Sequence, residues 1–257
     1  MFLDFKGTAV HYTDSGKGSA IVLLHGFLEN ATIWSPFVPI LSKSHRVICI
    51  DLLGHGKSGS LGYIHTMELM AEAVSAILKH LKVKKVTLIG HSMGGYVTLA
   101  MAETSPNSIL GLCLVNSTAN ADSIEKKTNR DRAIAVIKED SATFIKIAIP
   151  NLFTPKNRAL FSEEIEALKQ EALKTPVQGM IAALEGMKIR KDRNFVLKNS
   201  LPKKMMVIGK KDPVLNKEDL LAQVKDANIE IVEFPDGHMS FIENQQDLLQ
   251  EIMHFIE

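Results

Sequence analysis

Gly90-His91-Ser92-Met93-Gly94-Gly95 follows the apolar, β-rich run Val86–Ile89 and precedes a helical pattern over Tyr96–Glu103. A serine between glycines at a strand-to-helix turn fits the G-x-S-x-G motif, in which a strained turn projects the hydroxyl away from the backbone. Glycine suits the flanking positions because it has no Cβ to collide with the adjoining strand and helix. An ordinary Gly/Ser turn has the same composition, so the motif needs partners elsewhere in the chain. Ser92 is the candidate nucleophile.

Around this turn the chain alternates between apolar runs and helical patterns. The other apolar runs are Phe2–Phe5, Ala9–Tyr12, Ala20–Leu24, Val47–Ile50, Leu110–Val115, Met205–Ile208 and Ile229–Phe234. The other helical patterns of the core are Thr66–Leu81, Lys217–Val224 and Asn244–Ile256. The middle apolar runs have few polar residues, as expected for strands buried on both faces of a parallel sheet. The alternation predicts an α/β fold with a mostly parallel central sheet flanked by helices.

One region lacks a convincing strand pattern, from about Asp122 to Asn199. Its helical patterns are Ser123–Glu139, Ser141–Ile149, Asn157–Leu173 and Val177–Lys188, with prolines near their boundaries. We expect an all-helical insertion between two core strands. It would divide the chain into a first core part (residues 1–120), a helical part (121–200) and a second core part (201–257).

The composition is that of a soluble globular protein, with 46% apolar and 23% charged residues in 257. A net charge of +1 gives no reason to expect nucleic acid or an anionic membrane surface as a partner. The N-terminal residues lack the apolar stretch of a signal peptide, and no apolar run has the length of a membrane span. We therefore expect a cytoplasmic protein without a nucleic-acid or membrane partner.

The two cysteines, Cys49 and Cys113, lie inside apolar runs and are expected to be buried thiols. The sequence has neither C-x-x-C nor H-E-x-x-H spacing, the patterns typical of metal sites. We therefore expect no metal and no organic cofactor.

A serine hydroxyl is a weak nucleophile unless a base takes its proton and a third group orients that base. His238 follows the last predicted strand within Pro235-Asp236-Gly237-His238, and Asp212 follows the strand before it within Gly209-Lys210-Lys211-Asp212. Loops after the carboxyl ends of parallel strands open onto the edge where α/β proteins place ligands. The chain order Ser92, Asp212, His238 is the order of an α/β-hydrolase triad.

Other acidic and imidazole groups compete for these roles. Asp122 is the main rival acid, because it also follows a predicted strand. Asp236 is too close to His238 within one loop to be a good partner for it. His25, His55 and His91 stand inside motifs, where shaping turns and pocket walls is the expected role.

Four motifs resemble those of the α/β-hydrolase superfamily, and the similarity runs from the first strand to the last helix. They are Leu24-His25-Gly26-Phe27, Asp51-Leu52-Leu53-Gly54-His55-Gly56-Lys57-Ser58, Gly90-His91-Ser92-Met93-Gly94-Gly95, and the pair Gly209-x-x-Asp212 with Gly237-His238. The resemblance implies that the helical insertion is a lid. It assigns an oxyanion hole to the backbone N–H groups of Phe27 and Met93. Its sheet order would also separate Cys49 from Cys113 by two strands, too far for a disulfide.

The resemblance implies hydrolysis of small-to-medium carboxylic esters through an acyl-enzyme, with a small-molecule acyl substrate and no cofactor. A carbon–carbon bond hydrolase uses the same triad, and a small-molecule sensor of this fold can retain it, so both alternatives stay open. Epoxide hydrolases and haloalkane dehalogenases need a carboxylate where this chain has Ser92. Cyanohydrin lyases have a lysine where it has Met239. Substrate identity and oligomeric state are left open.

Overall fold

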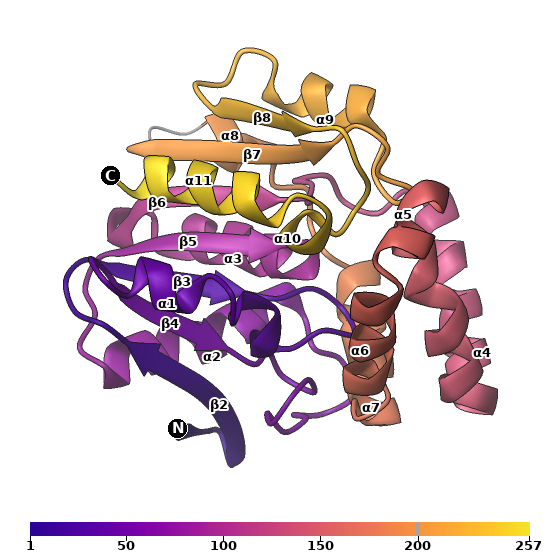
Figure 1. The fold of residues 1–257 in the computed structure, drawn as a ribbon. Coiled ribbons are helices and arrows are strands. Elements are labelled where there is room, and N and C mark those ends of the chain that lie inside the picture. Colours follow the sequence, from indigo (N-terminus) through magenta and orange to yellow (C-terminus); the bar gives the residue numbers. More distant parts are fainter. Residues whose placement is uncertain (199–200) are drawn as a thin grey trace.

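A single sheet of eight strands organises residues 1–198 and 201–257, which a computed structural model describes (Figure 1). The strands are β1 (Phe2–Phe5), β2 (Thr8–Ser15), β3 (Ala20–Leu24), β4 (Arg46–Ile50), β5 (Val86–His91), β6 (Ile109–Val115), β7 (Lys203–Gly209) and β8 (Glu230–Phe234). Their order is β1-β2-β4-β3-β5-β6-β7-β8. β1 and β2 pair antiparallel, β2 also pairs antiparallel with β4, and the pairs from β4 through β8 are parallel. The predicted α/β fold with a mostly parallel sheet is confirmed.

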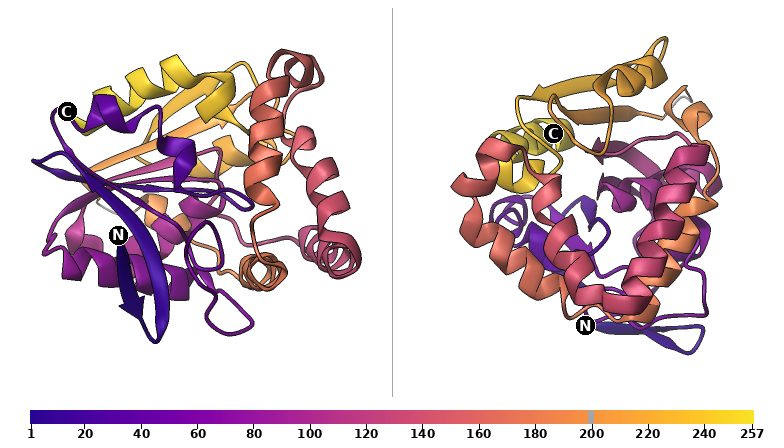
Figure 2. Two further views of the ribbon diagram at one scale, coloured as in Figure 1. Left: turned by 60° about the horizontal axis from the view of Figure 1, so that its bottom comes forward. Right: turned by 90° about the vertical axis from the view of Figure 1, so that its right-hand side faces the viewer.

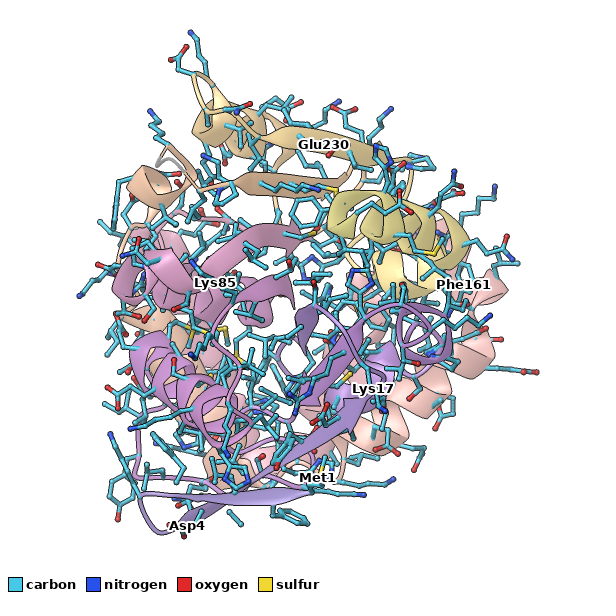
Figure 3. All side chains as sticks on the ribbon, turned by 90° about the vertical axis from the view of Figure 1, so that its left-hand side faces the viewer. Met1, Asp4, Lys17, Lys85, Phe161 and Glu230 are labelled. Atoms are coloured by element: carbon cyan, nitrogen blue, oxygen red, sulfur yellow. The ribbon has the colours of Figure 1, made fainter. Side chains whose placement is uncertain are left out.

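Helices cover both faces of the sheet (Figure 2). The helices of the core are α1 (Val38–Leu41), α2 (Met67–His80), α3 (Met93–Thr104), α9 (Lys217–Val224), α10 (Ser240–Glu243) and α11 (Gln245–Ile256). α1 and α11 lie on one face, and α2 and α3 lie on the other. All five residues of β3 are buried as a result, whereas the edge strand β8 buries only Phe234. In Figure 3, Asp4 of β1 and Glu230 of β8 mark opposite ends of the sheet.

The helix α2 illustrates how local sequence forms these layers. The Thr66 side chain accepts a hydrogen bond from the Leu69 N–H and caps the first turn. Met70, Val74 and Ile77 follow at helical spacing, and all three are completely buried. One face of α2 therefore packs into the core, and the hydrogen-bonded cap fixes where the helix begins.

All the elements that the described residues form between β6 and β7 are helices. They include α4 (Ile124–Ala148), α5 (Pro155–Leu160), α6 (Ser162–Ala172), α7 (Val177–Lys188) and α8 (Asn194–Lys198). We call α4 to α7 the helical segment. These helices lie beside the edge where the parallel strands end (Figures 1 and 2). Asn199 and Ser200, the last residues of the insertion expected from the sequence, lie outside the described residues.

The sequence separates the patterns Ser123–Glu139 and Ser141–Ile149 at Asp140, and the structure has a break at that residue. Asp140 has a non-helical backbone (φ −152°, ψ 89°) inside α4, so two helices meet there at a kink. Another expected boundary differs from the observed one. Asn157–Leu173 was expected as one helix, but the backbone of Phe161 (φ −107°, ψ 34°) separates α5 from α6. Figure 3 labels Phe161 at this break. The Phe161 side chain packs against the hydrophobic core, and its ring lies 6.4 Å from that of Phe153. The break in the helical pattern therefore coincides with a tertiary contact.

Ion pairs attach the base of the helical segment to the core. The Asp122 carboxylate is fully buried and pairs with both Arg130 and Arg190. The Arg190 guanidinium also lies 4.1 Å from the ring centre of Tyr96 on α3. Burial disfavours the charge of Asp122, but the two arginines outweigh it and lower the pKa of this carboxyl. Loss of one partner would leave a buried charge uncompensated, which is strongly destabilising.

The two cysteines lie on different strands of the sheet interior. Cys49 is on β4 and Cys113 is on β6, and two strands, β3 and β5, separate them. Both thiols are free and buried. Burial raises the pKa of Cys49 to about 12, so the thiol stays protonated. The expectation that they form no disulfide is confirmed.

No helix in the described ranges is long and apolar enough to cross a bilayer.

The contact between α3 and β3 depends on a glycine. A Cβ at Gly94 would lie 2.5 Å from the Leu24 carbonyl oxygen and 2.7 Å from that of His25. These are backbone atoms, so they cannot move aside as a flexible side chain can. Gly94 therefore sets how closely the helix after the turn approaches the sheet.

Gly94→Ala is expected to lower the free energy of unfolding by about 3 kcal/mol or more, because the added methyl overpacks a backbone contact. The matched control is Gly62→Ala, where φ is +74° but no atom lies within 4 Å of the added Cβ. The control should cost only about 1 kcal/mol, from its left-handed backbone. Urea denaturation of both variants measures the difference. Equal losses would contradict the proposed role of the α3–β3 contact.

Candidate active site

Ser92 lies at the turn between β5 and α3 in an unusual backbone conformation. Its φ is +48° and its ψ is −113°, which is sterically unfavourable for a residue with a side chain. The Ser92 N–H donates to the Val115 carbonyl at 2.9 Å, and the Ser117 hydroxyl donates to the Ser92 carbonyl at 2.7 Å. A Cβ at Gly90 would lie 2.4 Å from the Gly94 carbonyl group. Hydrogen bonds to β6 and to the loop after it, together with close glycine contacts, thus hold the strained turn.

The structure brings Ser92, His238 and Asp212 together at the carboxyl edge of the sheet. His238 Nε2 lies 2.9 Å from Ser92 Oγ, and His238 Nδ1 lies 2.7 Å from Asp212 Oδ2. Ser92 follows β5, Asp212 follows β7 and His238 follows β8. The parallel strands therefore carry three residues that are far apart in sequence to one place. The Asp212 side chain is fully buried, His238 is nearly so, and Ser92 is half-buried.

Backbone donors surround the Asp212 carboxylate. Its Oδ1 accepts from the N–H groups of Val214 at 2.8 Å and Leu215 at 3.0 Å. Its Oδ2 accepts from Asn116 Nδ2 at 3.2 Å as well as from His238. Burial opposes the negative charge, but His238 and the two backbone donors outweigh it and lower the pKa of Asp212. Asp212 is therefore a carboxylate that accepts a hydrogen bond from the Nδ1–H of His238 and orients the ring.

The rival acids have other partners. Asp122 is paired with Arg130 and Arg190 at the base of the helical segment. Asp236 accepts from Asn157 Nδ2 and from Asn244 Nδ2, both at 2.9 Å. Neither carboxylate is hydrogen-bonded to the His238 ring, whose Nδ1 is held by Asp212.

Two backbone N–H groups that follow the carboxyl ends of β3 and β5 have no acceptor within residues 1–198 and 201–257. They belong to Met93, the first residue of α3, and to Phe27, in the loop after β3. An N–H at the start of a helix has no partner inside the helix and carries partial positive charge. These are the two groups that the family resemblance assigns to an oxyanion hole.

The histidines of the sequence motifs differ in charge. His25 Nε2 accepts from the Leu52 N–H, and its Nδ1 donates to the Gly26 carbonyl, so the ring is neutral. Burial is the main cause that lowers the pKa of His25. Burial and the neighbouring His25 also lower the pKa of His55 to about 3.

His91 instead forms a buried ion pair with Glu29. His91 Nδ1 lies 3.0 Å from Glu29 Oε2, and its Nε2 lies 3.0 Å from the His238 carbonyl oxygen. Both ring nitrogens face acceptors, so both carry protons. Burial opposes this charge, but Glu29 outweighs it and raises the pKa of His91. Glu29 also accepts from the Gly26 N–H at 2.6 Å, so the pair connects the loops that carry Phe27, Ser92 and His238.

Sequence reasoning missed several of these supporting residues. Glu29, Asn116 and Ser117 were not singled out, although Asn116 and Ser117 directly follow an apolar strand, where site residues gather in α/β folds. Their position directly after the strand could have pointed to Asn116 and Ser117. The role of Glu29 depends on its contact with His91, which lies 62 residues away along the chain.

The described residues contain no group of three or more His, Cys, Asp or Glu side chains arranged to hold a metal ion. The site itself presents a hydroxyl, an imidazole and a carboxylate in hydrogen-bond contact.

Comparison with known proteins gives the family. The family model described as the alpha/beta hydrolase fold matches residues 19–245. The chain is 27% identical over 93% of its length to a dihydrolipoyllysine-residue acetyltransferase component of the acetoin cleaving system of Pseudomonas putida. It is 30% identical over 64% of its length to an (E)-2-((N-methylformamido)methylene)succinate hydrolase of Acinetobacter baylyi. The matches span only 64% and 59% of those two relatives.

A solved structure of a thermophilic esterase from Thermogutta terrifontis superimposes with a TM-score of 0.91. Its sequence is 30% identical, and the match covers 97% of this chain and 93% of the esterase. The family model covers most of this chain, and the eight-stranded sheet has the corresponding architecture. The protein belongs to the α/β-hydrolase fold family.

Proposed function

We propose that this protein is a serine hydrolase that cleaves small-to-medium carboxylic esters through an acyl-enzyme. One observation carries the proposal: an unbroken chain of hydrogen bonds from Ser92 Oγ through His238 to the Asp212 carboxylate, with distances of 2.9 and 2.7 Å. Such a chain turns a weakly nucleophilic hydroxyl into a reactive one, because the imidazole can take its proton.

The proposed reaction begins when Ser92 Oγ attacks the ester carbonyl carbon and His238 Nε2 takes the hydroxyl proton. The Asp212 carboxylate stabilises the imidazolium that forms. The N–H groups of Phe27 and Met93 bind the oxyanion of the tetrahedral intermediate. His238 then protonates the leaving alcohol, and an acyl-enzyme remains on Ser92. In the second half His238 activates a water molecule, which releases the carboxylic acid and restores the serine.

Ester cleavage is supported by the similarity to the Thermogutta terrifontis esterase, which is 30% identical over nearly the whole chain. A carbon–carbon bond hydrolase would use the same three residues and is the second candidate. The helical segment lies beside the edge where Ser92 and His238 are found, a position suited to a lid. We propose this role for it and a cytoplasmic location for the protein.

Ser92→Ala is expected to reduce hydrolysis of p-nitrophenyl acetate and butyrate to near background, a loss on the order of 10⁶ in kcat by analogy with other triads. The variant should also fail to react with a fluorophosphonate, which labels activated serines. Ser35→Ala, at an exposed serine, is the matched control and should keep wild-type turnover and labelling. Full turnover in Ser92→Ala would exclude this serine as the nucleophile.

Asp212→Asn and Asp122→Asn distinguish the two acids that the sequence offered. Asp212→Asn should lower kcat by roughly 10⁴, because the amide favours the wrong tautomer of His238. Asp122→Asn should lower the melting temperature, because it weakens a buried ion pair, and should change kcat less than threefold. Ester kinetics and thermal unfolding of both variants measure this. The reverse pattern would assign the acid role to Asp122.

A panel of p-nitrophenyl esters of increasing acyl length, run beside a vinylogous 1,5-diketone, separates the two enzyme candidates and the sensor. An esterase should turn over many equivalents of ester and little diketone. A carbon–carbon hydrolase should prefer the diketone. A single slow turnover with altered protease sensitivity of the helical segment would favour a sensor instead.

A further inference from the structure

His238 is held at both ends of its backbone by groups from other parts of the chain. Its carbonyl oxygen accepts from His91 Nε2 at 3.0 Å. Its N–H donates to the carbonyl of Leu152 at 3.0 Å. Leu152 belongs to the helical segment, in the short turn between α4 and α5. The helical segment therefore contacts the backbone of the proposed general base directly.

A second contact between the helical segment and the loop of His238 is made by the Asn157 side chain of α5. Asn157 is 4% exposed. Its Nδ2 lies 2.8 Å from Glu243 Oε1 and 2.9 Å from Asp236 Oδ1. A side-chain amide has two N–H donors, and here each has a carboxylate acceptor.

Those two carboxylates lie on either side of His238 in the sequence, Asp236 in the loop after β8 and Glu243 at the end of α10. Glu243 Oε2 accepts from the N–H groups of Gly237 and Met239, both at 3.1 Å, which are the residues on either side of His238. Asp236 lies in this loop two residues before His238, and it is also held by Asn244. Burial is the main cause that raises the pKa of Glu243, and the hydrogen bond from Asn157 opposes this rise. Asn157 thus supplies neutral donors between two nearby acidic groups.

We propose that Asn157 is a positioning residue for His238. It acts through Glu243 and Asp236, so the imidazole is correctly placed only while the helical segment is docked on the loop that carries it. The inference rests on the proposed function, because it concerns the base of that reaction. It assigns the helical segment a part in holding the catalytic geometry, in addition to covering the site.

The test uses the full-length protein with Asn157→Leu, which keeps the side-chain size and removes both donors. The matched control is Asn151→Leu, the same change at an exposed residue of the same segment. The concentration of competent enzyme is titrated to completion with a fluorophosphonate, and kcat is expressed per titrated site. Asn157→Leu should lower this kcat roughly 10- to 100-fold with KM changed less than about threefold, since small misplacement of a catalytic group has effects of this size. The control should match wild type.

A double-mutant cycle with Glu243→Gln tests the route of the effect. If Asn157 acts through Glu243, the combined loss in kcat should be clearly smaller than the product of the single losses. Asn157→Asp provides a nearly isosteric second variant if Asn157→Leu fails to fold. It cannot donate to either carboxylate when ionised, so it should show a similar loss in kcat.

Wild-type kcat per titrated site in a folded Asn157→Leu or Asn157→Asp variant overturns the proposal. Fully multiplicative losses in the cycle overturn the route through Glu243. These outcomes differ from failure of the proposed function, in which the wild-type protein itself neither hydrolyses esters nor takes the label. In that case the inference falls with the function on which it rests.

Discussion

The strained backbone at Ser92 sets the geometry of the candidate active site. A residue with a side chain at φ +48° is unfavourable, and it persists only where the surroundings over-determine it. Here the neighbouring strand β6 holds its N–H, Ser117 holds its carbonyl, and glycines allow α3 to pass close to β3. This conformation presents the Ser92 hydroxyl at the edge of the sheet, between β5 and α3, and not within the helix or the strand. The parallel strands then decide which other loops can reach that hydroxyl.

A buried ion pair joins the loops that carry Phe27, Ser92 and His238. Glu29 and His91 are both fully buried, and ionised groups in such a place are stable only when they satisfy each other and their neighbours. The pair meets this condition through the Gly26 N–H and the His238 carbonyl. The three loops therefore share one buried network, and displacement of any one of them leaves a charge without its partner. The relative positions of these loops are thus linked to the stability of the buried Glu29–His91 pair.

Much of this architecture could be predicted from the sequence, for identifiable reasons. The run Ala20–Leu24 was predicted at its observed bounds, because a strand buried on both faces is apolar at every position. Helix α7 was likewise predicted residue for residue. The motifs also singled out Ser92, Asp212 and His238, which the fold brings into contact. The break at Phe161 and the roles of Glu29 and Asn157 could not be predicted, because each depends on a partner that only the tertiary structure brings near.

The position of the two cysteines has a consequence for how the stability of this protein can be followed. Both thiols lie on interior strands of the sheet, protonated and shielded from solvent. Cys113 is completely buried, so a thiol-specific reagent can reach it only when the sheet opens, not when surface loops fluctuate. Cys49 is 2% exposed and lines a cavity beside β2, so smaller movements can expose it. The two thiols lie on either side of the strands β3 and β5, and β5 leads into the turn that carries the serine. Their separate rates of modification in native buffer would distinguish opening of the sheet from local movement without any engineered label.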